Sequence, residues 1–272
     1  MKRVTLWVAM LAVPVAFGQP ASPADEAPPH HLAPLDGATV VRPGSALLRL
    51  DRLRPYTQTL QMHALDADGT ERAGVSMRFT FTRQTDEQGN DFWRFRSDIG
   101  SGENAMFYVV EFDPETGEAL RQHQKDPLGE VVATFDGHTL RGTKTAPATD
   151  DLPDPQPEPF ELALPTRIFQ FSAVPSLVAT MDLAPGQRIS LPSIDFHKLE
   201  VGWVTLDFHQ QEALDAPGGE IRAWAYDMYQ LGGTFSERHL RTDTPALAQF
   251  VVEGNGRRFT WKTVAFETPD SG

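Results

Sequence analysis

The chain has 272 residues, of which none is cysteine, and 24 basic residues against 37 acidic ones give a formal net charge of −13. The negative charge repels nucleic acid and anionic lipid headgroups, and no basic block offsets it, so nucleic-acid binding is not expected. The absence of cysteine excludes disulfides, cysteine-ligated zinc and a cysteine nucleophile, so the fold has to be stabilised by its hydrophobic core.

The N-terminus has the pattern of a secretory signal. Met1-Lys2-Arg3 is followed by an apolar run that ends near Phe17, which is shorter than the roughly 20 residues that cross a bilayer. We expect a signal peptide over 1–18, a periplasmic location and no transmembrane anchor in the mature chain; a buried N-terminal helix is the alternative. The proline- and alanine-rich residues that follow predict a disordered leader over 19–44.

Strand patterns begin at about residue 45 and predict a single β-rich domain over 45–268. In "VSMRFTFTR" the apolar residues Met77, Phe79 and Phe81 alternate with polar ones, and "LQMHALD", "FWRFRS" and "RFTWKTVAF" alternate in the same way. A period of two indicates strands with one buried face and one wetter face.

Turn sequences rich in Asp, Asn and Gly separate these runs: "DADGT", "DEQGN", "DPETGE", "FDGH", "APGGE" and "EGNGR". These residues supply the positive φ angles that tight hairpins need. Short strands joined by tight turns make an antiparallel meander, whereas a parallel sheet needs long helical crossovers. The fold class is therefore expected to be mainly β.

Two segments depart from the strand pattern. Residues 145–159, "TAPATDDLPDPQPEP", form an acidic proline-rich insert, either a mobile connection within one domain or a boundary between two lobes. Residues 172–187 are the best helix candidate, with Ser172 as a cap and Pro175 in the first turn. Their apolar stripe would include Leu177 and Met181, although a loop is possible at this length.

The tripeptide Asp-Phe-His occurs twice within residues 192–211. A hairpin that turns at Gly202 would pair the two copies across neighbouring strands, with Phe196 and Phe208 on the buried face. The polar face would then gather four side chains of the kind that zinc accepts: Asp195, His197, Asp207 and His209.

We interpret these four residues as surface partners, because ligands on an open sheet face lack the outer shell that orients them. A metal-dependent hydrolase that uses this patch is the alternative. The second strand could instead pair with 219–230 across "APGG". No metal and no cofactor is otherwise indicated, since nucleophile-elbow, P-loop, dinucleotide and calcium-loop motifs are missing.

The strand "EIRAWAYDMYQ" places Trp224, Tyr226 and Met228 on one face and small side chains on the other. Large aromatic residues on a curved sheet either fill the core or line a groove for a ligand. We expect an apolar ligand to contact six residues: Trp203, Trp224, Tyr226, Met228, Leu177 and Met181.

The order of several segments resembles a family of bacterial periplasmic proteins of uncharacterised function. The similarity covers roughly residues 48–267 and rests on "FDGHTLRGT", "PSLVATMDLAPGQRISLP", "HQQEALDAPGGEIRAWAYDM" and "RRFTWKTVAF". In that family a turn such as Leu183 to Gly186 follows a short apolar segment, and a strand with a glutamate, here Glu212, leads into a second turn at 216–219.

Such proteins are thought to resemble lipoprotein carriers, and the resemblance implies an antiparallel sheet curved into a half-barrel or open barrel, with a short helix and loops on its concave side. The resemblance implies no catalytic residues for this chain. We expect a non-enzymatic protein that binds an apolar ligand or an envelope protein on the concave face, with the hydrolase or a scaffold module as alternatives.

Overall fold

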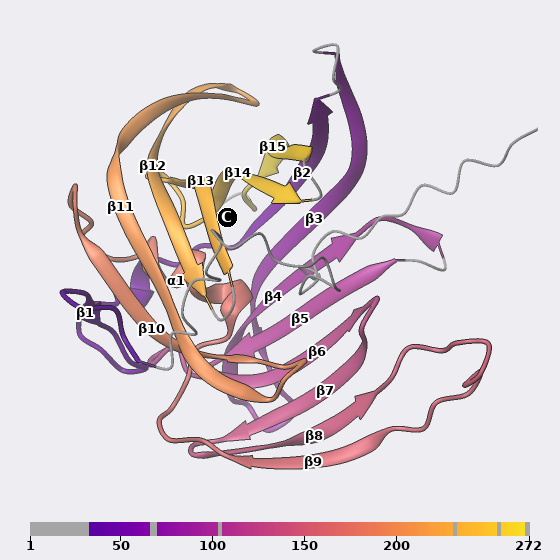
Figure 1. Ribbon diagram of the computed structural model, residues 1–272. Coiled ribbons are helices and arrows are strands. Elements are labelled where there is room, and N and C mark those ends of the chain that lie inside the picture. The colour runs from indigo at the N-terminus through magenta and orange to yellow at the C-terminus, as the bar shows by residue number, and fades with distance from the viewer. Residues whose placement is uncertain (1–32, 66–69, 103–104, 231–232, 255–256, 270–272) are drawn as a thin grey trace, which may run out of the picture.

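A computed structural model of the chain describes residues 33–65, 70–102, 105–230, 233–254 and 257–269 (Figure 1). The expected signal peptide and the first part of the expected leader lie outside these residues. Within them, no helix combines the length and the apolar character that crossing a bilayer requires.

In the described residues, fifteen strands form one sheet in the order β1-β10-β11-β12-β13-β14-β15-β2-β3-β4-β5-β6-β7-β8-β9. Each strand pairs with its neighbours in antiparallel fashion, except that β1 runs parallel to β10. The strands are β1 (Thr39–Val40), β2 (Tyr56–Leu65), β3 (Glu71–Thr85), β4 (Asp91–Ile99), β5 (Met106–Phe112), β6 (Ala119–Asp126), β7 (Gly129–Asp136), β8 (Thr139–Thr145), β9 (Glu158–Ala163), β10 (Arg188–Asp195), β11 (Glu200–Ala216), β12 (Gly219–Gln230), β13 (Gly233–Arg241), β14 (Leu247–Gly254) and β15 (Arg257–Glu267).

The sheet is curved and open, and a short helix lies in its hollow. Strands β10–β15 and strands β2–β9 form two halves that face each other around α1 (Val174–Val178) (Figure 1). The described residues also contain the 3-10 turns η1 (Leu50–Arg52) and η3 (Phe171–Ala173). The expected fold class, a mainly β open meander with one short helix, is thus confirmed.

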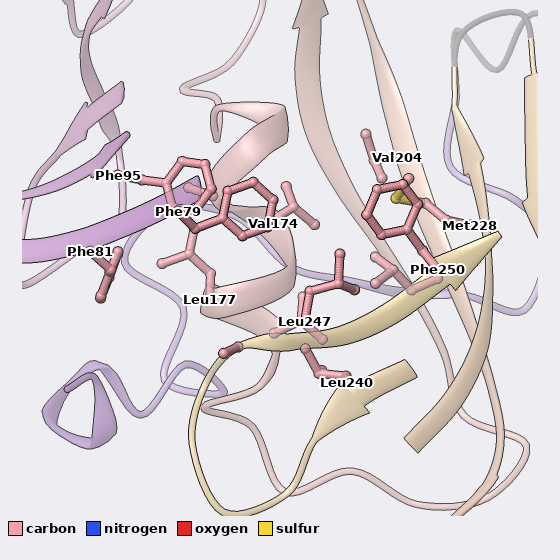
Figure 2. Close-up of a cluster of buried hydrophobic side chains, with 14 of the residues drawn as sticks. Phe79, Phe81, Phe95, Val174, Leu177, Val204, Met228, Leu240, Leu247 and Phe250 are labelled. Carbon is pink, nitrogen blue, oxygen red and sulfur yellow. The ribbon is translucent and has the colours of Figure 1, made fainter. Parts of the chain in front are cut away.

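The main hydrophobic core fills the concave side of this sheet. Phe79 and Phe95 on one half and Met228 and Phe250 on the other lie on opposite sides of Leu177 of α1 (Figure 2). The alternation read from the sequence holds, because Met77, Phe79 and Phe81 are all buried and the residues between them are partly exposed.

A second, smaller cluster joins the two ends of the sheet, and we call this region the seam. It comprises Ala119, Val131, Ala133, Phe135, Leu140, Leu164, Ile168, Ile194 and Phe196. The irregular segment 164–170 bridges the gap, because the Ala119 amide donates to the Ile168 carbonyl at 3.1 Å and the Phe169 amide donates to the Pro192 carbonyl at 2.9 Å.

Order begins earlier in the chain than the expected leader allows. Strand β1 lies within residues 19–44 and pairs with β10. Next to it, the Val41 amide donates to the Ser190 carbonyl at 2.9 Å. The cause is that Val41 is fully buried in the main core. Strand β8 leads into the proline-rich insert and β9 follows it, and these two strands pair with each other in the same sheet.

The helix is shorter than the candidate over 172–187. Pro175 lies in its first turn as expected, but α1 ends at Val178 and is preceded by η3. Ser172 is not the cap; instead, the Gln170 side chain accepts a hydrogen bond from the Ser172 amide at 2.5 Å.

The hairpin that contains the two Asp-Phe-His copies turns at residues 196–199 and not at Gly202. Asp195 therefore faces Glu200, and Asp207 faces Arg188. The turn forms because Asp195 Oδ1 accepts hydrogen bonds from the His197 and Lys198 amides at 2.9 and 3.2 Å. Strand β11 also pairs with β12, which is the pairing that the sequence offered as the alternative.

Candidate ligand-binding site

A cavity of about 140 Å³ lies on the concave side of the sheet, between its two halves and the N-terminal end of α1. Aromatic and aliphatic side chains supply most of the wall. The lining residues are Tyr56, Met77, Phe79, Phe95, Ser97, Tyr108, Phe171, Ser172, Pro175, Ser176, Met228, Arg238, Leu247 and Phe250. Their side chains come together only because β2–β5 and β12–β14 curve around the helix (Figures 1 and 2).

Two phenols in the wall, the buried Tyr56 and the partly buried Tyr108, are hydrogen-bonded. The Tyr56 and Ser176 hydroxyl oxygens lie 3.2 Å apart, and the Tyr108 hydroxyl donates to Asp126 Oδ2 at 3.1 Å. Burial raises the pKa of Tyr56 to about 12, and burial together with the Asp126 carboxylate raises the pKa of Tyr108. Both phenols are therefore neutral near pH 7 and offer hydrogen bonds, not basic catalysis.

Arg238 adds a guanidinium group to this apolar wall. Its carbon Cζ lies 5.0 Å from the centre of the Phe250 ring, a cation–π geometry, and its backbone is directly opposite Tyr226 in the β12–β13 pairing. Burial lowers the pKa of Arg238, while Tyr226 acts in the opposite direction. The cavity thus combines a large apolar surface with a few polar groups, the composition typical of small-molecule sites.

A second, polar cleft of about 600 Å³ lies beyond the C-terminal end of α1. It is lined by the segment after α1, by the region of η1 and by the end of β13 with the loop that follows. The residues are Arg52, Arg54, Ala179, Met181, Asp182, Leu183, Gln211, Trp224, Arg241, Thr242, Asp243, Thr244 and Pro245.

Of the six residues expected to contact an apolar ligand, the structure brings only Met228 into the wall of the apolar cavity. Tyr226 and Leu177 are fully buried in the main core, and Trp224 and Met181 line the polar cleft.

Trp203 lies on the other face of β11. Its neighbour Val204 points into the main core, and successive residues of a strand point to opposite faces. The Arg42 guanidinium covers the Trp203 ring at 5.6 Å.

Sequence reasoning missed most of the cavity wall, including Phe171, Arg238, Leu247 and Phe250. The alternation in "VSMRFTFTR" and "FWRFRS" did identify the inward faces that carry Phe79 and Phe95. No comparable signal marks Arg238, because a single arginine in a strand is usually solvated.

The four residues of the alternative metal patch do not converge. His197 Nε2 contacts Asp126 Oδ2 at 3.2 Å, His209 Nε2 contacts Asp227 Oδ2 at 3.1 Å, and Arg188 binds Asp207. Asp195 is used in the turn that begins β11. The zinc site kept as the alternative does not form, and neither do the Asp–His pairs expected between the two strands. The hairpin has a different register, in which Asp207 faces Arg188 and Asp195 faces Glu200. Among the described residues, no group of three or more potential ligands could hold a metal ion.

The comparisons with known proteins agree with this architecture. A crystal structure described as a beta-barrel-like protein of domain of unknown function DUF1849 from Brucella abortus is similar to the chain, with a TM-score of 0.50 and 12% sequence identity over 80% of this chain and 99% of that one. At this identity the similarity concerns the fold alone. No curated protein matches the sequence. A family model described as a protein of unknown function, DUF3108, matches residues 61–245, more than half of the sequence, and the chain belongs to that family.

Proposed function

We propose that the protein is a non-enzymatic periplasmic binding protein that takes an apolar ligand, or the apolar end of a larger one, into the concave cavity. The single observation that carries this proposal is the aromatic wall around about 140 Å³ of space. Cavities of about 150 Å³ with apolar walls stay dry and accept benzene-sized molecules. Burial of the ligand would supply about 25 cal/mol per Å² of apolar surface before the costs of ordering.

The polar groups of the wall would orient the ligand more than they would attract it. The hydroxyls of Tyr56, Ser176 and Tyr108 already have partners, and Arg238 lies against Phe250. A periplasmic location is supported by the signal-like pattern of the first eighteen residues. Fractionation of cells that express the full chain tests the location independently of binding.

Fluorobenzene followed by ¹⁹F NMR tests the site, because it matches the cavity in size and carries no charge. We expect saturable binding by the wild-type protein. Ser172→Phe should abolish it, because Ser172 lines the cavity, is only partly buried and can accept a ring that fills the space. The matched control is Ser101→Phe, the same substitution at an exposed position, which should bind as the wild type does.

Whereas Ser172→Phe fills the cavity, Phe250→Leu tests the effect of a larger one. It enlarges the cavity, so it should admit 1-fluoronaphthalene, which the wild-type protein should exclude. Absence of wild-type binding, or unchanged binding by a folded Ser172→Phe variant, would refute the proposal.

A further inference from the structure

The polar cleft gathers three guanidinium groups from two distant parts of the chain. Arg52 belongs to η1 and Arg54 follows it, whereas Arg241 ends β13. Two carboxylates, Asp182 and Asp243, line the same cleft. The charged residues of the lining therefore carry one net positive charge in a chain whose formal net charge is −13.

Arg241 is held rigidly. Its Nε and Nη2 donate to the two oxygens of Asp243 at 2.8 and 2.6 Å, and its Cζ lies 4.2 Å from the centre of the Phe266 ring. The side chain is 7% exposed, and the buried Nη1 has no hydrogen-bond partner among the described residues. A buried guanidinium N–H without an acceptor is costly, and a bound oxyanion would supply the acceptor that Nη1 lacks.

The other two guanidinium groups are oriented by main-chain carbonyls. Arg52 Nη1 donates to the Thr180 carbonyl at 3.0 Å and to Asp182 Oδ1 at 2.7 Å. Arg54 Nη1 donates to the carbonyls of Asp51 and Leu53 at 2.6 and 2.8 Å. Asp182 is 73% exposed, so its carboxylate is a weakly held counter-charge that a stronger oxyanion can displace.

We propose that this cleft is a second binding site, for a small molecule that carries a phosphate-type oxyanion. Guanidinium groups bind phosphate with paired, charge-assisted hydrogen bonds, and three of them favour a doubly charged group over a single carboxylate. The cleft volume of about 600 Å³ falls within the range of small-molecule sites. Trp224 in its wall offers an apolar contact to the rest of the molecule.

The cleft is separate from the apolar cavity. Met228 lines the cavity and Trp224 lines the cleft, and these residues are four positions apart on β12, or about 13 Å. Tyr226, fully buried between them, fills the space. The two sites can therefore be tested with different ligands and different variants, and failure at one does not bear on the other.

Calorimetric titration of the full chain with phenyl phosphate, benzoate and phenol at low ionic strength tests the proposal. We expect phenyl phosphate to bind more tightly than benzoate, phenol not to bind, and the affinity for phenyl phosphate to fall as salt is added. Arg54→Gln should weaken phenyl phosphate binding about tenfold or more, because it removes charge-assisted hydrogen bonds. Arg54 is exposed, and the hydrogen bonds of its side chain to described residues go to the carbonyls of Asp51 and Leu53, so this variant should fold normally.

Asp182→Asn should change the affinity in the opposite direction, tightening binding several-fold, because it removes the carboxylate that competes for Arg52. Arg141→Gln is the matched control, since Arg141 is an exposed arginine that pairs with Glu161 far from the cleft, and it should bind as the wild type does.

Arg241→Gln should also weaken phenyl phosphate binding. If this variant does not fold, the result for Arg54→Gln alone tests the role of the guanidinium groups. Equal affinities for phenyl phosphate and benzoate, wild-type affinity in Arg54→Gln, or weaker binding in Asp182→Asn would overturn the proposal. So would the absence of any phenyl phosphate binding.

Discussion

His197 Nε2 lies 3.2 Å from Asp126 Oδ2, and this contact ties the β10–β11 turn to the end of β6 across the seam. The Asp126 side chain is fully buried. It also accepts hydrogen bonds from the Tyr108 hydroxyl at 3.1 Å and from the Leu128 amide at 2.8 Å. Since Tyr108 lines the cavity, one carboxylate connects the candidate binding site with the closure of the sheet.

Replacing Asp126 with Ala should lower the free energy of unfolding by roughly 3 kcal/mol, because it removes a buried carboxylate and leaves the partly buried His197 and Tyr108 without their acceptor. Tyr108→Phe should cost about 1 kcal/mol, the usual value for a single hydrogen bond. Urea denaturation measures both, and the double variant should cost less than the sum of the two. Additive effects would show that the two side chains do not interact in solution.

Three tyrosines whose pKa values are raised predict unfolding in alkali. Burial raises the pKa values of Tyr56, Tyr108 and Tyr226, with Tyr56 at about 12. Because the unfolded chain releases these protons near pH 10, the stabilisation is complete below that pH and is lost as the pH rises toward 12.

For Tyr56, whose pKa rises from about 10 to about 12, the stabilisation lost is on the order of 3 kcal/mol. Urea midpoints from about pH 9 to about pH 11.5 should therefore fall steeply, and ultraviolet titration should show tyrosines that ionise only on unfolding. Tyr56→Phe should flatten part of this dependence. A midpoint that stays constant up to pH 11.5 would contradict the burial of these phenols.

Tyr226→Ala should destabilise the fold by about 3–5 kcal/mol, the cost of truncating a large aromatic side chain in a core. Tyr226 is fully buried, and its ring centre lies 5.3 Å from that of Phe208. Combined with Trp224→Ala, it should abolish the cooperative thermal transition seen by circular dichroism. A double variant that still folds would show that the core does not depend on these two side chains, and they would again be candidates for contact with a ligand.

Two glycines with positive φ separate the cost of a steric clash from the cost of backbone strain. A Cβ at Gly129 (φ 123°) would lie 2.2 Å from the Thr145 carbonyl oxygen, whereas a Cβ at Gly89 (φ 88°) would meet nothing within 4 Å. Gly89→Ala should cost about 1 kcal/mol from strain alone. Gly129→Ala should cost clearly more in the same urea measurement, and equal costs would show that β7 and β8 move apart freely.

The strands and their buried faces could be predicted because alternation is a local signal. Met77, Phe79 and Phe81 pack inward as the period of two requires. The register of β10 and β11 could not be predicted in the same way. Gly202 suggested a turn, but it lies within β11 opposite Ser193, while Leu199 takes a positive φ of 53°, which a leucine rarely adopts. The Asp195 side chain, which accepts two amides of the turn, was the available signal.

The candidate site was much less predictable than the strands. An alternating pattern shows that Tyr226 and Met228 point inward, but it does not show which of them fills the core and which borders empty space. That difference depends on where α1 sits against both halves of the sheet, and it is decided by contacts between residues far apart in the chain.

The pairing of β15 with β2 has a consequence for how the molecule is made. Glu267 at the end of the last strand is opposite Thr57 at the start of the first long one, so the middle of the sheet is completed by its latest-synthesised segment. Until β15 has been synthesised, β2 and β14 each have an unpaired edge, and no continuous ladder of backbone hydrogen bonds joins the two halves of the sheet. A chain that stops before Arg257 should therefore remain protease-sensitive, and the isolated β15 peptide added in trans should restore protection.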